Sequence, residues 1–100
     1  MSDRQLVFED FADKIGEEFA ISEETVPRIT LILRDAEPLD PAMAPRGVRP
    51  PFALLFLASD PRVLPQRLYR MEHKAFGTVS SFLVPVGKDT SGVTYQATFN

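Results

Sequence analysis

The chain has 100 residues, of which 44% are hydrophobic and 25% are charged, and its formal net charge at pH 7 is −3. This length suits one compact domain with one core, so residues 1–100 are predicted to form a single domain. The absence of cysteine excludes disulfides and thiolate metal sites and fits a reducing compartment. An acidic chain without a basic stripe is not expected to bind nucleic acid, because phosphate neutralisation supplies most of that affinity.

The N-terminal stretch contains no targeting or membrane signal. It has neither a basic region followed by an apolar core nor a run of about 18 apolar residues. We therefore expect a cytoplasmic protein without membrane contact.

An amphipathic helix of about two turns is predicted next. Gly16 stands where a helix often ends in the left-handed conformation, whereas Val7 is a poor N-cap. A helix this short is not stable alone, so its apolar face is expected to cover one open end of a barrel. That face is formed at positions i, i+3, i+4 and i+7 by Phe8, Phe11, Ala12 and Ile15.

Four segments between the helix and residue 75 are predicted as strands. They are residues 17–22, 28–36, 52–58 and 67–73. Most alternate apolar and polar residues, as a strand with one buried face does. The segment 52–58 is apolar on both faces and bounded by prolines, which indicates an innermost strand covered on both sides.

The last 25 residues are predicted to form a β-hairpin. Two extended segments, 78–86 and 93–99, flank the polar connection 87–92, whose two glycines are expected to take positive φ angles. Pro85 cannot donate to a ladder, so it is expected at an edge or a bulge. One face of the second strand is predicted to be buried, with the residues Val93, Tyr95, Ala97 and Phe99.

These elements predict a mainly β protein, α+β by strict count. The architecture is a small antiparallel β-barrel or curled sheet of about six strands with one short N-terminal helix.

Residues 38–51 carry five of the nine prolines and show no periodicity. Irregular segments of this length in compact domains are often functional, so this is the first candidate for a partner contact. The candidate partner-binding residues within it are Pro41, Met43, Arg46 and Arg49.

Catalytic equipment is not apparent. His73 is the only histidine, and it is expected to be an exposed or lightly hydrogen-bonded ring at the end of a strand rather than a catalytic base. The serines lack a Gly-x-Ser-x-Gly context, and the acidic groups lack the spacing of a calcium loop. We therefore predict no enzyme activity and no catalytic, cofactor or metal-binding residues.

Several motifs together resemble a family of short, stand-alone bacterial proteins without an assigned function. The most specific are Phe82-Leu-Val-Pro-Val-Gly87 and the closing Tyr95-Gln-Ala-Thr-Phe-Asn100, preceded by Pro51-Phe-Ala-Leu-Leu-Phe56. Val7 departs from the family, whose members tend to have a hydroxyl residue at the helix start. The resemblance implies no catalytic residues, and it implies an accessory or assembly role beside phage-tail-like particles.

Two functional hypotheses follow. The first is a non-enzymatic interaction protein that uses an exposed strand edge or residues 38–51 to bind a protein partner or itself. The alternative is a small-molecule-binding β-barrel in which the apolar faces of residues 52–58 line a cavity.

Overall fold

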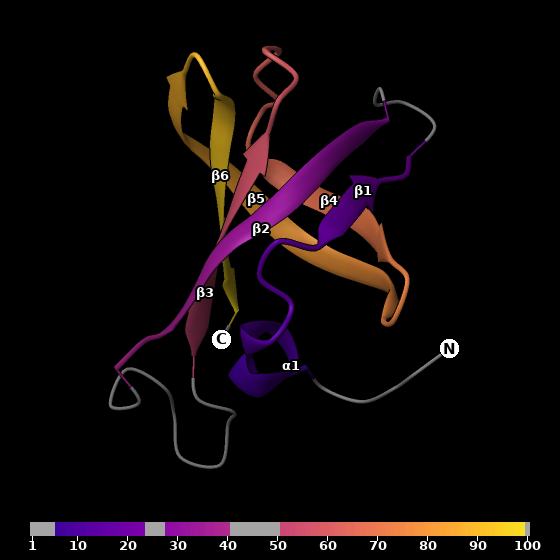
Figure 1. The fold of residues 1–100 in the computed structure, drawn as a ribbon, viewed down its shortest axis with the longest axis vertical. Helices are drawn as coiled ribbons and strands as arrows, with labels where there is room; N and C mark the ends of the chain where they lie inside the picture. The colour runs from indigo at the N-terminus through magenta and orange to yellow at the C-terminus, as the bar shows by residue number, and fades with distance from the viewer. Residues whose placement is uncertain (1–5, 24–27, 41–50, 100) are drawn as a thin grey trace.

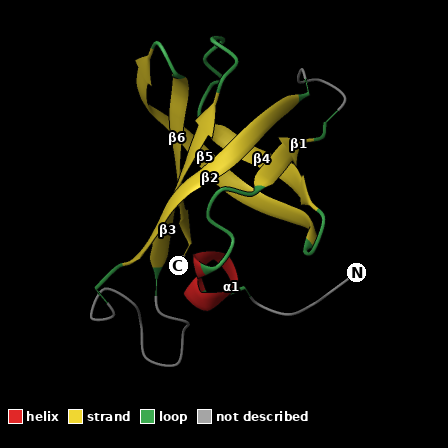
Figure 2. Ribbon diagram, in the orientation of Figure 1, coloured by secondary structure: helices red, strands yellow, loops and turns green. Residues whose placement is uncertain are grey.

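The computed structural model describes residues 6–23, 28–40 and 51–99 (Figure 1). In these ranges the chain forms one short helix and six strands, so it is mainly β as predicted (Figure 2). The elements are α1 (Phe8–Ala12), β1 (Glu18–Ile21), β2 (Ile29–Pro38), β3 (Phe52–Ala58), β4 (Arg67–His73), β5 (Gly77–Asp89) and β6 (Gly92–Phe99).

The strands form one antiparallel sheet that closes on itself. The order around the ring is β1-β2-β3-β6-β5-β4, and β4 pairs again with β1. The predicted small barrel or curled sheet is thus confirmed as a closed ring. One detail of the prediction is wrong, because a ring has no innermost strand: β3 lies in the wall like its neighbours, with Leu55 and Leu57 half-buried on its outer side.

The C-terminal hairpin forms with a tighter turn than predicted. Both strands continue through most of the polar connection, so that Asp89 pairs with Gly92. Of the two glycines expected at positive φ, Gly92 has it, at 133°, whereas Gly87 does not. Pro85 lies beside the register shift between β5 and β6, which confirms its placement at a bulge. A short turn suffices because the two residues between the paired ends reverse the chain.

Helix α1 covers one end of the ring, at the bottom of Figure 1. It ends at Ala12, one turn earlier than predicted, so that Ile15 is 46% exposed and Ala12 is exposed. The helix stops because the chain turns to join β2, where the Gly16 N–H donates to the Leu33 carbonyl at 2.7 Å. The buried face therefore consists chiefly of Phe11, which is fully enclosed.

The helix start does not depend on the residue at the N-cap. The Asp10 carboxylate accepts a hydrogen bond from the Val7 N–H at 2.7 Å. The Asp10 N–H in turn donates to the Val7 carbonyl at 3.0 Å. The Asp10 carboxylate thus caps the Val7 N–H, and the Val7 carbonyl, rather than its side chain, accepts from the first turn.

The opposite end of the ring is closed by the loop between β3 and β4 (Figure 1). Leu64 of this loop is buried in the core. The loop is attached through two tyrosine hydroxyls: Tyr95 accepts from the Leu64 N–H at 3.0 Å, and Tyr69 donates to the Pro65 carbonyl at 2.5 Å. Both ends of the core are therefore covered by side chains.

Candidate functional site

The seam between β1 and β4 is the shortest ladder among the described strands. The register pairs are Ala20 with Glu72 and Ile21 with Met71. By contrast, β3 pairs with β6 along its whole length. With so few backbone bonds, closure of the ring at this seam depends on side chains.

Two glutamates that flank β1 hold it to β4. Before the strand, Glu17 Oε1 lies 2.6 Å from His73 Nε2. After the strand, Glu23 accepts from the Arg67 guanidinium and from the Arg70 N–H, both at 2.6 Å. The hydrogen bond from Arg67, followed by that from the Arg70 N–H, lowers the pKa of Glu23. We call these contacts the Glu17 clasp and the Glu23 clasp.

His73 lies inside the ring of strands, so of the two predicted alternatives the exposed ring is wrong, whereas a hydrogen-bonded ring at the end of a strand is confirmed. It takes the inward phase of β4 together with Tyr69 and Met71, and its side chain has no exposed surface. It packs between Phe19 and Phe76, at centroid distances of 4.5 and 4.8 Å. The imidazole is therefore part of the aromatic packing inside the ring of strands.

The hydrogen bonds of His73 fix its tautomer. Its Nδ1 accepts from the Ala75 N–H at 3.0 Å, so this nitrogen carries no proton. The proton lies on Nε2, which donates to Glu17. In this tautomer the histidine links β4 to the residue before β1.

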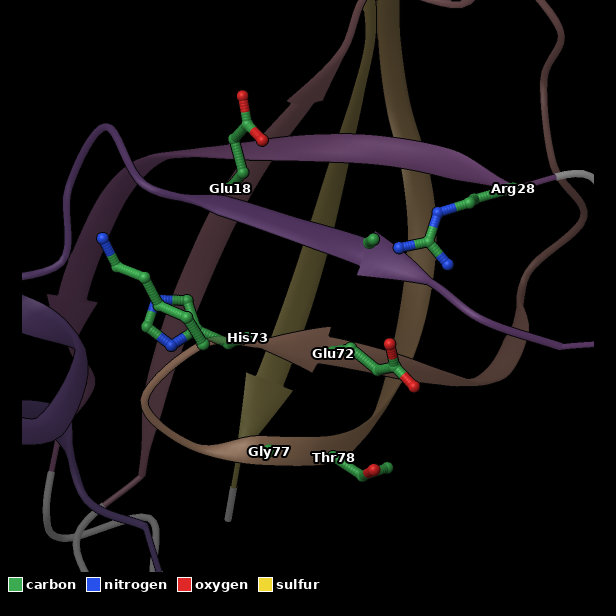
Figure 3. A pocket seen from close by; sticks show the side chains of 8 residues that line it. Glu18, Arg28, Glu72, His73, Gly77 and Thr78 are labelled. Carbon is green, nitrogen blue, oxygen red and sulfur yellow. The ribbon is translucent and has the colours of Figure 1, made fainter.

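A hollow of about 390 Å³ lies outside the same seam (Figure 3). Ala20, the register partner of Glu72, lines this hollow, and its small side chain leaves space at this point of the seam. Two adjoining hollows extend it along β1 toward Ser22 and Arg70. The first hollow is lined by Glu18, Ala20, Arg28, Glu72, His73, Lys74, Gly77 and Thr78.

Charged side chains of both signs surround these hollows. Of these, Glu23 pairs with Arg67, and within the part of the chain that the structure describes no ion pair involves the other five. Arg28 and Glu72 approach the first hollow from opposite sides of the seam (Figure 3). The five charged residues are Glu18, Arg28, Arg70, Glu72 and Lys74.

Two large apolar side chains lie further along the outside of β4 and β5. Leu68 is 57% exposed and Phe82 is 47% exposed, and the two are register partners. They point outward with the charged residues of β4, because alternate residues of a strand share a face. We call this surface the β4–β5 face: it consists of Leu68, Arg70, Glu72, Thr78, Ser80 and Phe82.

A family model described as "Domain of unknown function (DUF6916)" matches residues 6–99. The chain belongs to this family. The match agrees with the resemblance to short proteins without an assigned function. No curated protein and no solved structure matches the chain.

The sequence-predicted site and this face of the DUF6916 domain are different parts of the chain. Pro41, Met43, Arg46 and Arg49 lie outside the described residues, so their role stays a prediction. The residues on either side of this segment are joined by a hydrogen bond of 2.9 Å from the Leu39 N–H to the Pro51 carbonyl.

Sequence reasoning missed the β4–β5 face, although one signal was present. Leu68 stands in the polar phase of β4, with Arg70 and Glu72.

Among the residues that the structure describes, no three His, Asp or Glu side chains gather as a metal site would require. No helix in the described ranges is long and apolar enough to cross a membrane.

Proposed function

We propose that the chain is a non-enzymatic interaction domain, an accessory or assembly factor that binds a protein partner through its β4–β5 face. The observation that carries this proposal is the exposed cross-strand pair of Leu68 and Phe82. Exposed apolar side chains next to polar and charged ones are common at protein interfaces. Burying both side chains against a partner would remove their apolar surface from water.

The charges around this pair support the same role. Arg70 and Glu72 form no ion pair with other described residues. A partner can therefore pair with these charges without first breaking an ion pair of this chain. Such pairs chiefly raise association rate and specificity.

The burial of His73 favours a binding role over catalysis. The side chain is enclosed between Phe19 and Phe76 and hydrogen-bonded at both nitrogens. A small-molecule-binding role has less support, because the inward side chains of β3 belong to a continuous core. The hollows described above lie on the outer surface instead.

Two finer expectations belong to the same proposal. The resemblance to bacterial proteins found beside phage-tail-like particles is the reason to place the assembly role there. Residues 38–51 are a second segment that a partner could use, and deletion of residues 40–48 tests it separately. Loss of binding on that deletion, with the β4–β5 face intact, would assign binding to that segment.

Site-specific photo-cross-linking in the native cell tests the proposal. Phe82 is replaced by p-benzoylphenylalanine, and the matched control carries the same group at Arg34, an exposed position on β2. We expect a covalent protein adduct from position 82 and none from position 34. Equal adducts from both positions, or none from position 82, would contradict the proposal.

A further inference from the structure

We infer that the partner of the β4–β5 face is a second copy of this chain, bound about a two-fold axis. This inference rests on the proposed function and goes further by naming the partner. The axis would lie in the plane of the interface, at right angles to β4, at the level between Arg70 and Glu72. The β4 strands of the two copies would then face each other in antiparallel directions.

The shape of the face supports this arrangement. Leu68 and Phe82 protrude at one end of it. The 390 Å³ hollow lies at the other end, bordered by Lys74 and Thr78. Leu68 and Lys74 are six residues apart, about 20 Å along the chain, so the Arg70–Glu72 level lies midway between the protruding end and the hollow end.

A two-fold axis at that level exchanges the two ends. Leu68 would then lie over the turn that contains the partner's Lys74, beside the hollow. Phe82 would lie over the main chain of the partner's Phe76, whose ring packs inward against Phe11 and His73. The aliphatic stem of a lysine can cover an apolar side chain while its ammonium group stays in water. Each protruding end thus meets a recessed end of the other copy.

The charges match under the same operation. Arg70 of one copy would face the partner's Glu72, and Glu72 would face the partner's Arg70. One pair of neighbouring residues therefore gives two ion pairs across the interface, as an isologous contact requires. A face with one sign of charge would repel its own copy, whereas this face carries both signs. Charge complementarity therefore favours a second copy as the occupant.

Sedimentation velocity of the full chain, from micromolar to millimolar concentration, tests the inference. We expect a reversible dimer. Arg70→Glu should weaken dimerisation about 100-fold, because it places two like-charged pairs across the interface. Glu72→Arg should weaken it similarly. The double variant Arg70→Glu/Glu72→Arg should restore the dimer, because each pair forms again with reversed signs.

Arg34→Glu is the matched control, because it makes the same charge change on β2, which does not pair with β4 or β5. It should leave the dimer unchanged. Thermal melting of each variant shows that the fold is retained, which is expected because the Arg70 and Glu72 side chains are exposed. Leu68→Ser is an independent test of the apolar end and should also weaken the dimer.

Three results would overturn the inference: a monomer at every concentration, an Arg70→Glu dimer as tight as the parent, or a double variant that stays monomeric. These results are distinguishable from failure of the proposed function. A cross-link from position 82 to a different protein, with a monomeric chain, would reject self-association and keep the interaction role. A cross-link between two copies would support both.

Discussion

The wall of the ring and its seam are held in different ways. From β3 through β6 and β5 to β4, neighbouring strands pair over most of their length. At the seam, β1 and β4 share a short ladder, and the Glu17 and Glu23 clasps add the remaining contacts. A backbone ladder forms between strands of many different sequences, because main-chain groups make its hydrogen bonds, whereas each clasp requires particular side chains. The seam is therefore where single substitutions should act locally.

The largest effect is expected where wall and seam share a side chain. Phe11 contacts Phe19 of β1 as well as Phe52 and Phe99 of the wall. Phe11→Ala should lower the free energy of unfolding by about 3–5 kcal/mol, since it leaves a cavity in the core. Urea denaturation measures the loss.

Phe82→Ala is the matched control for this prediction. The same side chain is removed at a half-exposed position, where a loss below about 1 kcal/mol is expected. Equal losses at positions 11 and 82 would mean that α1 does not cover the core as described.

Within the wall, Gly92 allows a close backbone approach to Ala58. Its φ is 133°, and a Cβ there would overlap the carbonyl group of Ala58. Gly92→Ala should therefore cost about 3 kcal/mol, from the unfavourable φ together with the steric overlap. Gly87→Ala is the control, because no atom lies within 4 Å of the added carbon and φ is not positive. If the two variants were equally stable, the described geometry of the hairpin turn would be wrong.

The Glu17 clasp gives a smaller and more local effect. Glu17→Ala leaves the buried His73 Nε2–H without its acceptor, at a cost of about 1–2 kcal/mol. Glu17→Gln keeps an acceptor oxygen and should recover most of the loss. Hydrogen exchange should show faster opening of β1 amides in the alanine variant, with β3 and β6 amides unchanged. Uniform acceleration across all strands would refute a separate seam.

The Glu23 clasp makes the seam sensitive to acid. The pKa of Glu23 is lowered in the folded chain by Arg67 and by the Arg70 N–H. Its contribution is therefore complete above the ordinary glutamate pKa of about 4.3 and is lost as the pH falls through the lower folded value. Stability at the seam should decline in that window.

Exchange of β1 amides, measured against β6 amides at falling pH, reports this loss. Glu23→Gln should remove the pH dependence. At the loop that closes the far end, Arg62 lowers the pKa of Asp60 to about 2, so that contact should persist in stronger acid. If β1 opens with the same pH dependence in the parent chain and in the Glu23→Gln variant, Glu23 is not the group that titrates.

The sequence predicts the strands better than the contacts between distant segments. The bounds of β3 and β4 match the predicted 52–58 and 67–73, because their apolar residues and flanking prolines are local signals. The early end of α1 depends on the hydrogen bond from Gly16 to Leu33, which no local pattern shows. Contacts between distant segments are invisible to periodicity.

Part of the candidate site could be predicted from local sequence signals as well. The polar phase of β4 contains Leu68, which marks an exposed apolar residue once the strand is known. Its neighbour Phe82 becomes visible only with the β4–β5 register. The burial of His73 could be read from its phase with Tyr69 and Met71, but its partner Glu17 lies 56 residues away in the sequence.

The smallest predicted effect concerns a buried polar side chain of β5. The Ser81 side chain is buried, and its Oγ has no hydrogen-bond partner among the described residues. Ser81→Ala removes an unpaired buried hydroxyl and should raise the free energy of unfolding by up to about 1 kcal/mol. The control is Ser80→Ala, since Ser80 is the exposed neighbour on the same strand and should change little. A loss of stability at position 81 would mean that its hydroxyl finds a partner, and the wall would then hold a polar contact as specific as those of the seam.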